Sequence, residues 1–185
     1  MITLFSIDLH LFYALHNLAG QSALGDAVIV FFAKYYLFVL AGIMTGFIYK
    51  DYYISPRRKF LSGVSAVLLT VGASFVLAQI IYYFYHRARP FLALPIHHLL
   101  TESSYSFPSS HTIVIFSMAT AALAYSKRLA YFLYISGFIV GAARVMAGVH
   151  YPLDILGGII LGTLMGLVVQ VLAKSVTRQT NNALQ

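Results

Sequence analysis

The chain has no cysteine and no tryptophan, and only 9% of its 185 residues are charged. The absence of cysteine excludes disulfide bonds, thiolate catalysis and cysteine-ligated metals. Acidic residues are scarce as well, with five against 12 lysines and arginines, for a formal net charge of +7. A basic balance can indicate nucleic-acid binding, but these basic residues form no stripe on a polar face. We therefore predict no nucleic-acid partner.

Apolar residues dominate the composition. They make up 60% of the chain, and the mean hydropathy is +0.82, whereas a soluble domain is roughly 45–50% apolar. This composition indicates that residues 1–185 form a single integral membrane domain. No lysine or arginine precedes Lys34, so we expect no signal peptide, which would begin with a basic region.

Five apolar segments are long enough to cross roughly 30 Å of hydrocarbon as helices. They cover approximately residues 27–49, 60–85, 113–125 with flanking residues, 130–149 and 154–173. A sixth stretch, residues 3–19, is shorter and carries Asp8, His10 and His16. It predicts either a short span or an amphipathic helix in the membrane interface, and we favour a span. The predicted fold is all-α, a polytopic membrane helical bundle of five or six transmembrane helices.

The basic residues predict the orientation of this bundle. With alternating spans, eight of the twelve fall on one side, which the positive-inside rule makes cytoplasmic: Lys50, Arg57, Arg58, Lys59, Lys127, Arg128, Lys174 and Arg178. Arg87, Arg89 and Arg144 fall on the opposite side, against this charge bias. We therefore expect these three arginines to have a specific role at the outer face.

Three polar clusters converge on that outer boundary. In "YHRARPF", residues 85–91, Pro90 ends a span, so that Arg89 lies at the outer end of this span. In "ARVMAGVHYPLD", residues 143–154, Pro152 separates two spans, so that His150 and Asp154 meet across a turn. The third cluster is "SFPSSHT", residues 106–112, where a proline and two serines are typical of a helix start. Such a start offers free N–H groups and a positive dipole end to an anion.

Taken together, these residue types predict a chemistry. Arginines and backbone N–H groups recognise a tetrahedral oxyanion such as phosphate. A histidine oriented by a carboxylate is an activated nucleophile or base, and a second histidine can protonate a leaving oxygen. We predict phosphoryl transfer with a basic clamp in place of a metal, and no cofactor. Each feature alone has a structural explanation, namely snorkelling, helix capping or a buried hydrogen bond.

We expect His97 and His98 to lie in a solvated loop, and His10 and His16 in the interface.

The motifs over residues 80–160 resemble the type 2 phosphatidic acid phosphatases, which share a helical core with vanadium haloperoxidases. The family pattern is Lys, six residues, Arg-Pro; then Pro-Ser-Gly-His; then Ser-Arg, five residues, His, three residues, Asp. The corresponding residues in this chain are Arg89-Pro90, Pro108-Ser109-Ser110-His111, Ala143-Arg144, His150 and Asp154.

The resemblance implies a role for each matching residue. His150 attacks phosphorus and forms a phosphohistidine, Asp154 orients it, and His111 protonates the leaving group. The phosphoryl oxygens are held by Arg89, Arg144 and the backbone of Ser109 and Ser110. No metal is implied.

The chain departs from the family pattern at three positions. Tyr82 stands in place of the lysine, Ser110 in place of the glycine, and Ala143 in place of the serine. The missing lysine removes one phosphate contact. We expect Arg87 to replace it, with Lys34 as a weaker candidate that can instead pair with Asp26.

The chain is most similar to the small bacterial undecaprenyl-diphosphate phosphatases, through "LHNLAGQSALGDAVIVFFAKYY" (residues 15–36), "RPF" and "PSSHT". This implies a lipid phosphate substrate, undecaprenyl diphosphate, cleaved at the outer face of the bacterial plasma membrane for cell-wall (peptidoglycan) synthesis. Phosphatidylglycerophosphate and phosphatidate are alternative substrates. Two other classes are a haem protein with His111 and His150 as axial ligands, and a non-catalytic protein that binds or transports phospholipids.

Gly158, Gly162 and Gly166 recur every four residues in the last apolar segment. Small residues at this spacing let two helices approach closely. We expect the stripe to serve packing within the monomer, with the seam of a homo-oligomer as the alternative.

Overall fold

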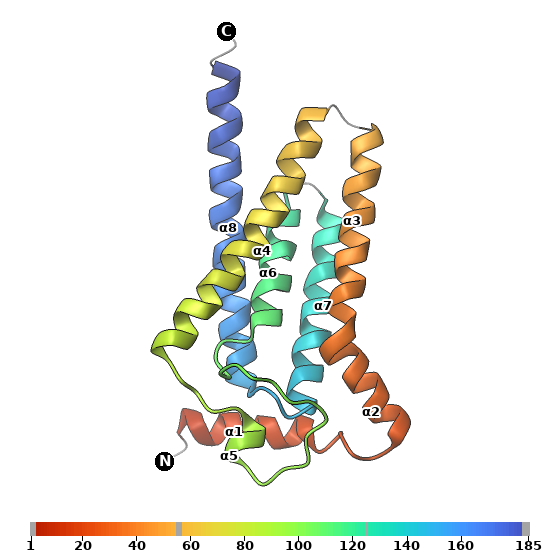
Figure 1. Cartoon of the computed structure of the whole chain (residues 1–185), viewed down its shortest axis with the longest axis vertical. Helices are drawn as coiled ribbons and strands as arrows, with labels where there is room; N and C mark the ends of the chain where they lie inside the picture. The colour runs from red at the N-terminus through yellow and green to blue at the C-terminus, as the bar shows by residue number, and fades with distance from the viewer. Residues whose placement is uncertain (1–2, 55–56, 125, 183–185) are drawn as a thin grey trace.

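The computed structural model describes the backbone of residues 3–54, 57–124 and 126–182, and the side chains of residues 3–47, 49, 68–124 and 126–172. Within these ranges every regular element is a helix, as predicted (Figure 1). The elements are α1 (Leu4–His16), α2 (Ala23–Val30), the π-helical segment η1 (Phe31–Tyr35), α3 (Tyr36–Ile54), α4 (Arg57–Phe84), α5 (Pro90–Ala93), α6 (Ser110–Ala122), α7 (Lys127–Met146) and α8 (Pro152–Asn182).

The long helices correspond to the five predicted spans. Within the part of the chain that the structure describes, three helices are long and apolar enough to cross a membrane, namely Ala23–Phe47, Lys127–Met146 and Pro152–Leu172, while Leu68–Phe84 and Ser110–Ala122 are shorter apolar helices. The first of these runs continuously through α2, η1 and α3, because the residues that flank η1 keep helical backbone angles. The protein is therefore an all-helical membrane bundle.

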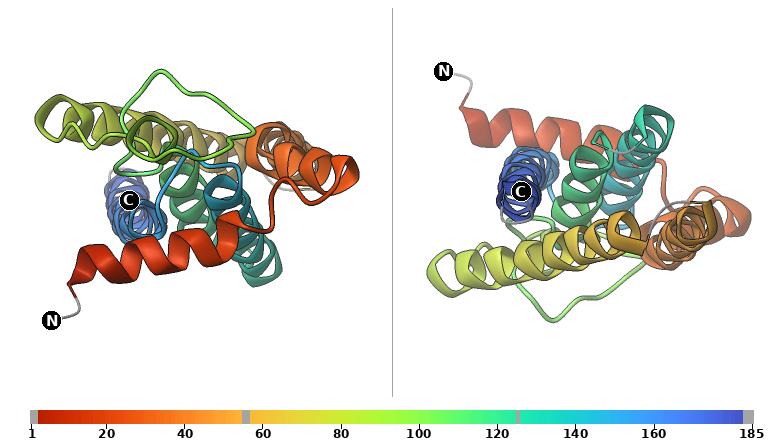
Figure 2. Two further views of the ribbon diagram at one scale, coloured as in Figure 1. Left: turned by 90° about the horizontal axis from the view of Figure 1, so that it is seen from below. Right: turned by 90° about the horizontal axis from the view of Figure 1, so that it is seen from above.

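Helix α1 lies across one end of the bundle instead of running along it (Figures 1 and 2). Phe12 anchors it, packing with Val145, Tyr151 and Ile155. The prediction that residues 3–19 span the membrane is therefore wrong, because tertiary contacts hold this apolar helix crosswise.

Helix α6 forms the centre of the bundle, and ten of its 13 residues are buried. It packs against α4, α7 and α8. The glycine stripe of α8 faces it: a Cβ added at Gly162 would lie 2.5 Å from the carbonyl oxygen of Ile113, and one at Gly166 would lie 2.5 Å from Cβ of Thr120. The prediction that this stripe packs within the monomer is confirmed.

The two ends of the bundle differ in character. Helix α1, helix α5 and the loop of residues 85–109 gather at one end. The C-terminal ends of α3, α6 and α8 and the N-terminal ends of α4 and α7 lie at the other (Figure 1). Lys127 and Arg128 begin α7 at that second end. The side chains of the other six basic residues in the predicted cytoplasmic set lie outside the described residues, although their positions in the chain belong to the same end.

Candidate active site

Polar side chains are buried together at the end of the bundle that α1 covers. Seven of them expose 1% of their surface or less: Asp8, Arg89, Ser106, Ser109, Arg144, His150 and Asp154. Buried polar groups are costly unless they are hydrogen-bonded or paired with a charge. Their partners therefore define how the site is built.

His150 lies at the centre of this cluster, in the turn between α7 and α8. Gly148 makes the turn possible with a φ of +79°, a conformation that favours glycine. Nε2 of His150 lies 3.2 Å from Nη1 of Arg89 and 3.2 Å from Nη2 of Arg144. A guanidinium group can only donate, so Nε2 carries the lone pair and Nδ1 carries the proton. The free lone pair makes Nε2 the nucleophilic atom.

The opposite side of the imidazole ring faces a carboxylate. Nδ1 of His150 lies 3.5 Å from Oδ2 of Asp154, at the edge of hydrogen-bonding range. Burial, supported by the charges of Arg144 and Arg89 and opposed by Asp154, lowers the pKa of His150 to about 4. The ring is therefore neutral at pH 7, as a nucleophile must be.

Arg89 is held by the loop that follows it. Its Nε donates to the carbonyl oxygen of Ser104 at 2.7 Å, and its Nη2 donates to Oγ of the same serine at 2.8 Å. Its Nη1 donates to the carbonyl oxygen of Val149 at 2.8 Å as well as facing His150. Three fixed acceptors thus aim the guanidinium at Nε2.

Arg144 comes from the last turn of α7 and is held by two acceptors from other elements. Its Nη1 donates to the carbonyl oxygen of Ala33, in η1, at 3.1 Å. A π-helical turn displaces carbonyl groups from the regular α-helical ladder, which gives this backbone oxygen to the arginine. Its Nη2 forms an ion pair of 2.9 Å with Glu102.

Asp154, in the first turn of α8, accepts hydrogen bonds at both carboxylate oxygens. Oδ2 accepts from Oγ of Ser106 at 2.5 Å and from the backbone N–H of Tyr151 at 2.8 Å. Oδ1 accepts from Nη1 of Arg87 at 2.5 Å. The carboxylate is therefore fixed in orientation before any substrate binds.

The N-terminus of α6 supplies the second histidine. The helix begins at Ser110, with Ser109 as its N-cap, as the sequence predicts, and Ser109 makes no side-chain capping bond. The backbone N–H of Ser109 donates to the carbonyl oxygen of Asp154 at 3.2 Å, so the N–H groups of the following residues remain to meet an anion. His111 follows in the first turn, within electrostatic reach of Arg144, His150 and Arg89, and its buried Nδ1 has no protein partner in the described part of the chain.

Tyr82 occupies the position where the family pattern has lysine. Its hydroxyl donates to the carbonyl oxygen of Pro108 at 2.8 Å, and its side chain is buried. The residue therefore supports the start of α6 from α4, with a neutral group in place of a charge.

Arg87 pairs with two carboxylates, whereas the sequence predicts a phosphate contact for it. Its two terminal nitrogens each lie 2.5 Å from a carboxylate, one on Asp154 and the other on Asp8, and its guanidinium lies 4.2 Å from the centre of the Tyr151 ring. Burial would lower the pKa of Arg87, but the carboxylates of Asp154 and Asp8 outweigh it and raise that pKa. The arginine therefore belongs to the Asp154 side of the site. Lys34, the weaker candidate, lies over the ring of Tyr35.

Sequence reasoning missed four residues that help to build the site: Asp8, Glu102, Ser104 and Ser106. The scarcity of acidic residues was an available signal. Asp8, Glu102 and Asp154 are three of only five in the chain, and all three pair with arginines here. Few acidic residues in a basic membrane protein indicate that each has a specific partner.

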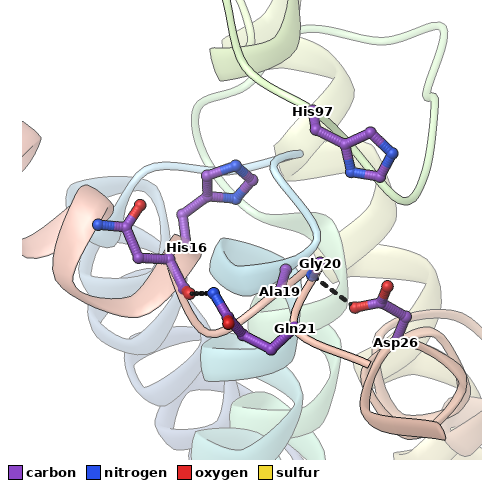
Figure 3. A pocket seen from close by; sticks show the side chains of 7 residues that line it. His16, Ala19, Gly20, Gln21, Asp26 and His97 are labelled. Carbon is purple, nitrogen blue, oxygen red and sulfur yellow. Dashed lines mark hydrogen bonds between the residues drawn. The ribbon is translucent and has the colours of Figure 1, made fainter. Parts of the chain in front are cut away.

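A pocket of about 500 Å³ lies beside α1 and is drawn in Figure 3. Its lining includes His16, Asp26 and His97. His97 is exposed, as predicted. His16 is buried in the protein, and its Nδ1 lies 2.9 Å from the carbonyl oxygen of Met146. Asp26 accepts from the N–H of Gly20 at 2.7 Å.

No group of three histidine, aspartate or glutamate side chains suited to a metal ion occurs among the described residues.

Comparisons with known proteins place the chain among membrane phosphatases. The sequence pattern of the PAP2 superfamily matches residues 63–178. The bacitracin transport permease protein BcrC of Bacillus licheniformis is 30% identical over 167 residues, which cover 88% of this chain and 79% of that protein. The undecaprenyl-diphosphatase BcrC of Bacillus subtilis is 26% identical over 163 residues, which cover 88% of this chain and 82% of that protein.

Solved structures share the fold. Aquifex aeolicus LpxE superposes with a TM-score of 0.70 at 25% identity, covering 92% of this chain and 98% of that one. The PAP2 type phosphatidylglycerolphosphate phosphatase of Bacillus subtilis gives a TM-score of 0.71 at 23% identity, covering 93% and 87%.

Proposed function

The chain belongs to the PAP2 superfamily and is an integral membrane enzyme that hydrolyses lipid phosphates, and from this premise we propose that it releases the terminal phosphate of undecaprenyl diphosphate. The observation that carries the chemistry is the environment of His150. Two arginines converge on Nε2, and a fixed carboxylate faces Nδ1. The name of the Bacillus subtilis relative supports the choice of lipid.

The first step transfers the phosphoryl group to His150. The phosphate takes over the guanidinium N–H groups of Arg89 and Arg144 that face Nε2 in the free enzyme. Nε2 attacks phosphorus, and the bond to the oxygen of the departing undecaprenyl phosphate breaks. His111 takes up a proton when the negatively charged substrate binds beside it, and gives that proton to the departing oxygen. The His150 ring becomes positively charged, and Asp154 stabilises this charge.

The second step releases phosphate. Water attacks the phosphohistidine, His111 takes a proton from that water, and the bond between Nε2 and phosphorus breaks. Inorganic phosphate leaves, and His150 returns to its neutral form. The two guanidinium groups neutralise the phosphoryl oxygens in both steps, since donors that are fixed beforehand need no reorganisation in the transition state.

The arrangement of the chain supports an outward-facing site in a bacterial plasma membrane. The candidate residues lie at the end of the bundle that α1 covers, and the helix ends that carry most lysines and arginines lie at the other (Figure 1). The positive-inside rule assigns the basic end to the cytoplasm. Phosphate release would then occur at the extracytoplasmic face, where the carrier lipid is recycled for peptidoglycan synthesis.

The alternative substrate is a glycerophospholipid phosphate. The name of a Bacillus subtilis relative that is 32% identical over 124 residues, phosphatidylglycerophosphatase B, supports it. The same two steps would apply to it. A haem site fits the geometry poorly, because two guanidinium groups occupy the space that an iron bound to Nε2 of His150 would need. A protein that only binds lipids has no need for a histidine oriented by a carboxylate.

The test is phosphate release by the purified protein in EDTA, with undecaprenyl diphosphate, phosphatidylglycerophosphate and phosphatidate offered in parallel. We expect release from the diphosphate, and its loss in His150→Ala. A preference for a glycerophospholipid would show that the substrate is that lipid and not the diphosphate, and the proposed two-step mechanism would still apply. Activity that survives in His150→Ala would contradict the nucleophile, and no release from any lipid by the wild type would overturn the proposed function.

A further inference from the structure

Arg87 joins two carboxylates from opposite ends of the sequence. It lies 2.5 Å from Asp8 in α1 and 2.5 Å from Asp154 in α8. The other oxygen of Asp8 accepts the backbone N–H of Leu153 at 2.9 Å. Asp8 thus holds both the arginine that contacts Asp154 and the backbone of the residue that precedes Asp154.

The charges in this group bear on the chemistry of His150. With Asp154 as its only partner, Arg87 would cancel the carboxylate charge that faces the imidazole ring. Asp8 adds a second negative charge, so Asp8, Arg87 and Asp154 together carry a net charge of −1. Since the His150 ring becomes positive when Nε2 attacks phosphorus, a net negative neighbour stabilises the transition state more than a neutral one.

We propose that Asp8 is a positioning residue for the phosphatase reaction, which takes up the charge of Arg87 so that Asp154 remains negative toward His150. The inference rests on the proposed function, because it concerns the same nucleophile. It extends the site to α1, a helix that carries none of the predicted catalytic residues.

Anchoring of α1 does not explain Asp8. Phe12 already holds that helix, packing with Val145, Tyr151 and Ile155 and stacking on His16. Asp8 is 1% exposed, and a buried ion pair is often no more stabilising than an apolar pair of similar volume. A charged residue buried at this point therefore indicates a role beyond packing.

Asp8 and Arg87 lie on the Asp154 side of His150. They line a pocket of about 650 Å³ together with Phe5, Tyr85, Phe107 and Leu153. Arg87 points both terminal nitrogens at carboxylates, while the phosphate is expected on the Nε2 side of His150. Asp8 must therefore act through Arg87 and Asp154.

The test compares Asp8→Asn with the double variant Asp8→Asn/Arg87→Met on the lipid that the wild type hydrolyses. The asparagine keeps the shape of the side chain, but the positive charge of Arg87 then neutralises the negative charge of Asp154. We therefore expect kcat to fall roughly tenfold with KM nearly unchanged. The double variant removes both charges and leaves Asp154 negative again. Its kcat should therefore exceed that of the single variant and lie within about threefold of the wild type.

The control is Asp26→Asn, the same chemical change at an aspartate whose carboxylate accepts only the Gly20 N–H among the described contacts. It should leave kcat unchanged. Wild-type kcat in Asp8→Asn would overturn the inference, and so would a double variant no more active than the single one. Should Asp8→Asn fail to fold, the double variant decides: kcat near the wild type supports the inference, and a loss of tenfold or more overturns it.

The wild-type reaction in the same assay separates this inference from the proposed function. If the wild type releases no phosphate from any lipid, both fail together. If the wild type is active and Asp8→Asn is equally active, the proposed function stands and only the role of Asp8 is overturned.

Discussion

The carboxylate of Glu102 lies 2.9 Å from Nη2 of Arg144, the same nitrogen that lies 3.2 Å from Nε2 of His150. A phosphate that binds at Nε2 must therefore compete with Glu102 for this arginine. Glu102 is the only glutamate in the chain and its side chain is 32% exposed, so it can leave toward solvent when a substrate arrives.

Replacing Glu102 with glutamine should lower KM by roughly threefold to tenfold and leave kcat nearly unchanged, because a neutral amide competes less well for the guanidinium group. Steady-state kinetics of phosphate release would measure both constants. Ser103→Ala, at an exposed neighbour in the same loop, is the control. A higher KM in Glu102→Gln would show instead that the carboxylate holds Arg144 in its binding position.

Replacing Tyr82 with phenylalanine should reduce kcat/KM by roughly tenfold, the effect of a lost hydrogen bond of about 1–2 kcal/mol. The change leaves the buried carbonyl of Pro108 without its 2.8 Å donor and frees the start of α6. Tyr83→Phe removes the same hydroxyl from the adjacent, 75% exposed residue and should have no effect. Equal kinetics for the two variants would contradict a supporting role for Tyr82.

His150 should stay neutral in the free enzyme well below the ordinary histidine pKa of 6.5, because burial lowers its pKa to about 4. NMR of protein with ¹³C-labelled histidine in detergent would follow the ring, with His150→Gln to assign the signal. Arg89→Gln should raise the midpoint by removing a positive neighbour, and Asp154→Asn should lower it by removing a negative one. A wild-type midpoint at 6.5 or above would contradict the neutral nucleophile.

Replacing Gly162 with alanine should lower the free energy of unfolding by about 1–3 kcal/mol. The added Cβ would lie 2.5 Å from the carbonyl oxygen of Ile113 and 3.0 Å from Cβ of Phe116, so α8 must move away from α6. Gly42→Ala is the matched control, since nothing lies within 4 Å of its added Cβ. Thermal unfolding in detergent would compare them, and similar melting temperatures would contradict close packing at Gly162.

The spans and the three polar clusters were predictable because their signals are local. Long apolar runs identify the helices, proline marks the breaks at Pro90 and Pro152, and the spacing of His150 and Asp154 across a turn brings them together. The role of α1 was not predictable, because its apolar content resembles that of a short span and only the contacts of Phe12 with α7 and α8 hold it crosswise.

The pairing of Arg87 with carboxylates was not predicted, for a geometric reason. Proximity in sequence to Arg89 suggested a common target, but two residues of extended chain advance by about 7 Å. That distance is enough to pass from Nε2 of His150 to the carboxylate of Asp154. Asp8 and Glu102 were missed because their partners, Arg87 and Arg144, lie far away in sequence, and no local pattern links them.

The pairing of Asp8 with Arg87 and Asp154 has a consequence for how the enzyme is made. A ribosome delivers α1 first and α8 last, so Asp8 emerges long before the carboxylate with which it shares an arginine. The catalytic centre closes only when the final helix has inserted beside α6 and its first turn has reached α1. A nascent chain that stalls before α8 thus lacks a complete centre and cannot hydrolyse lipid in the membrane where it is being assembled.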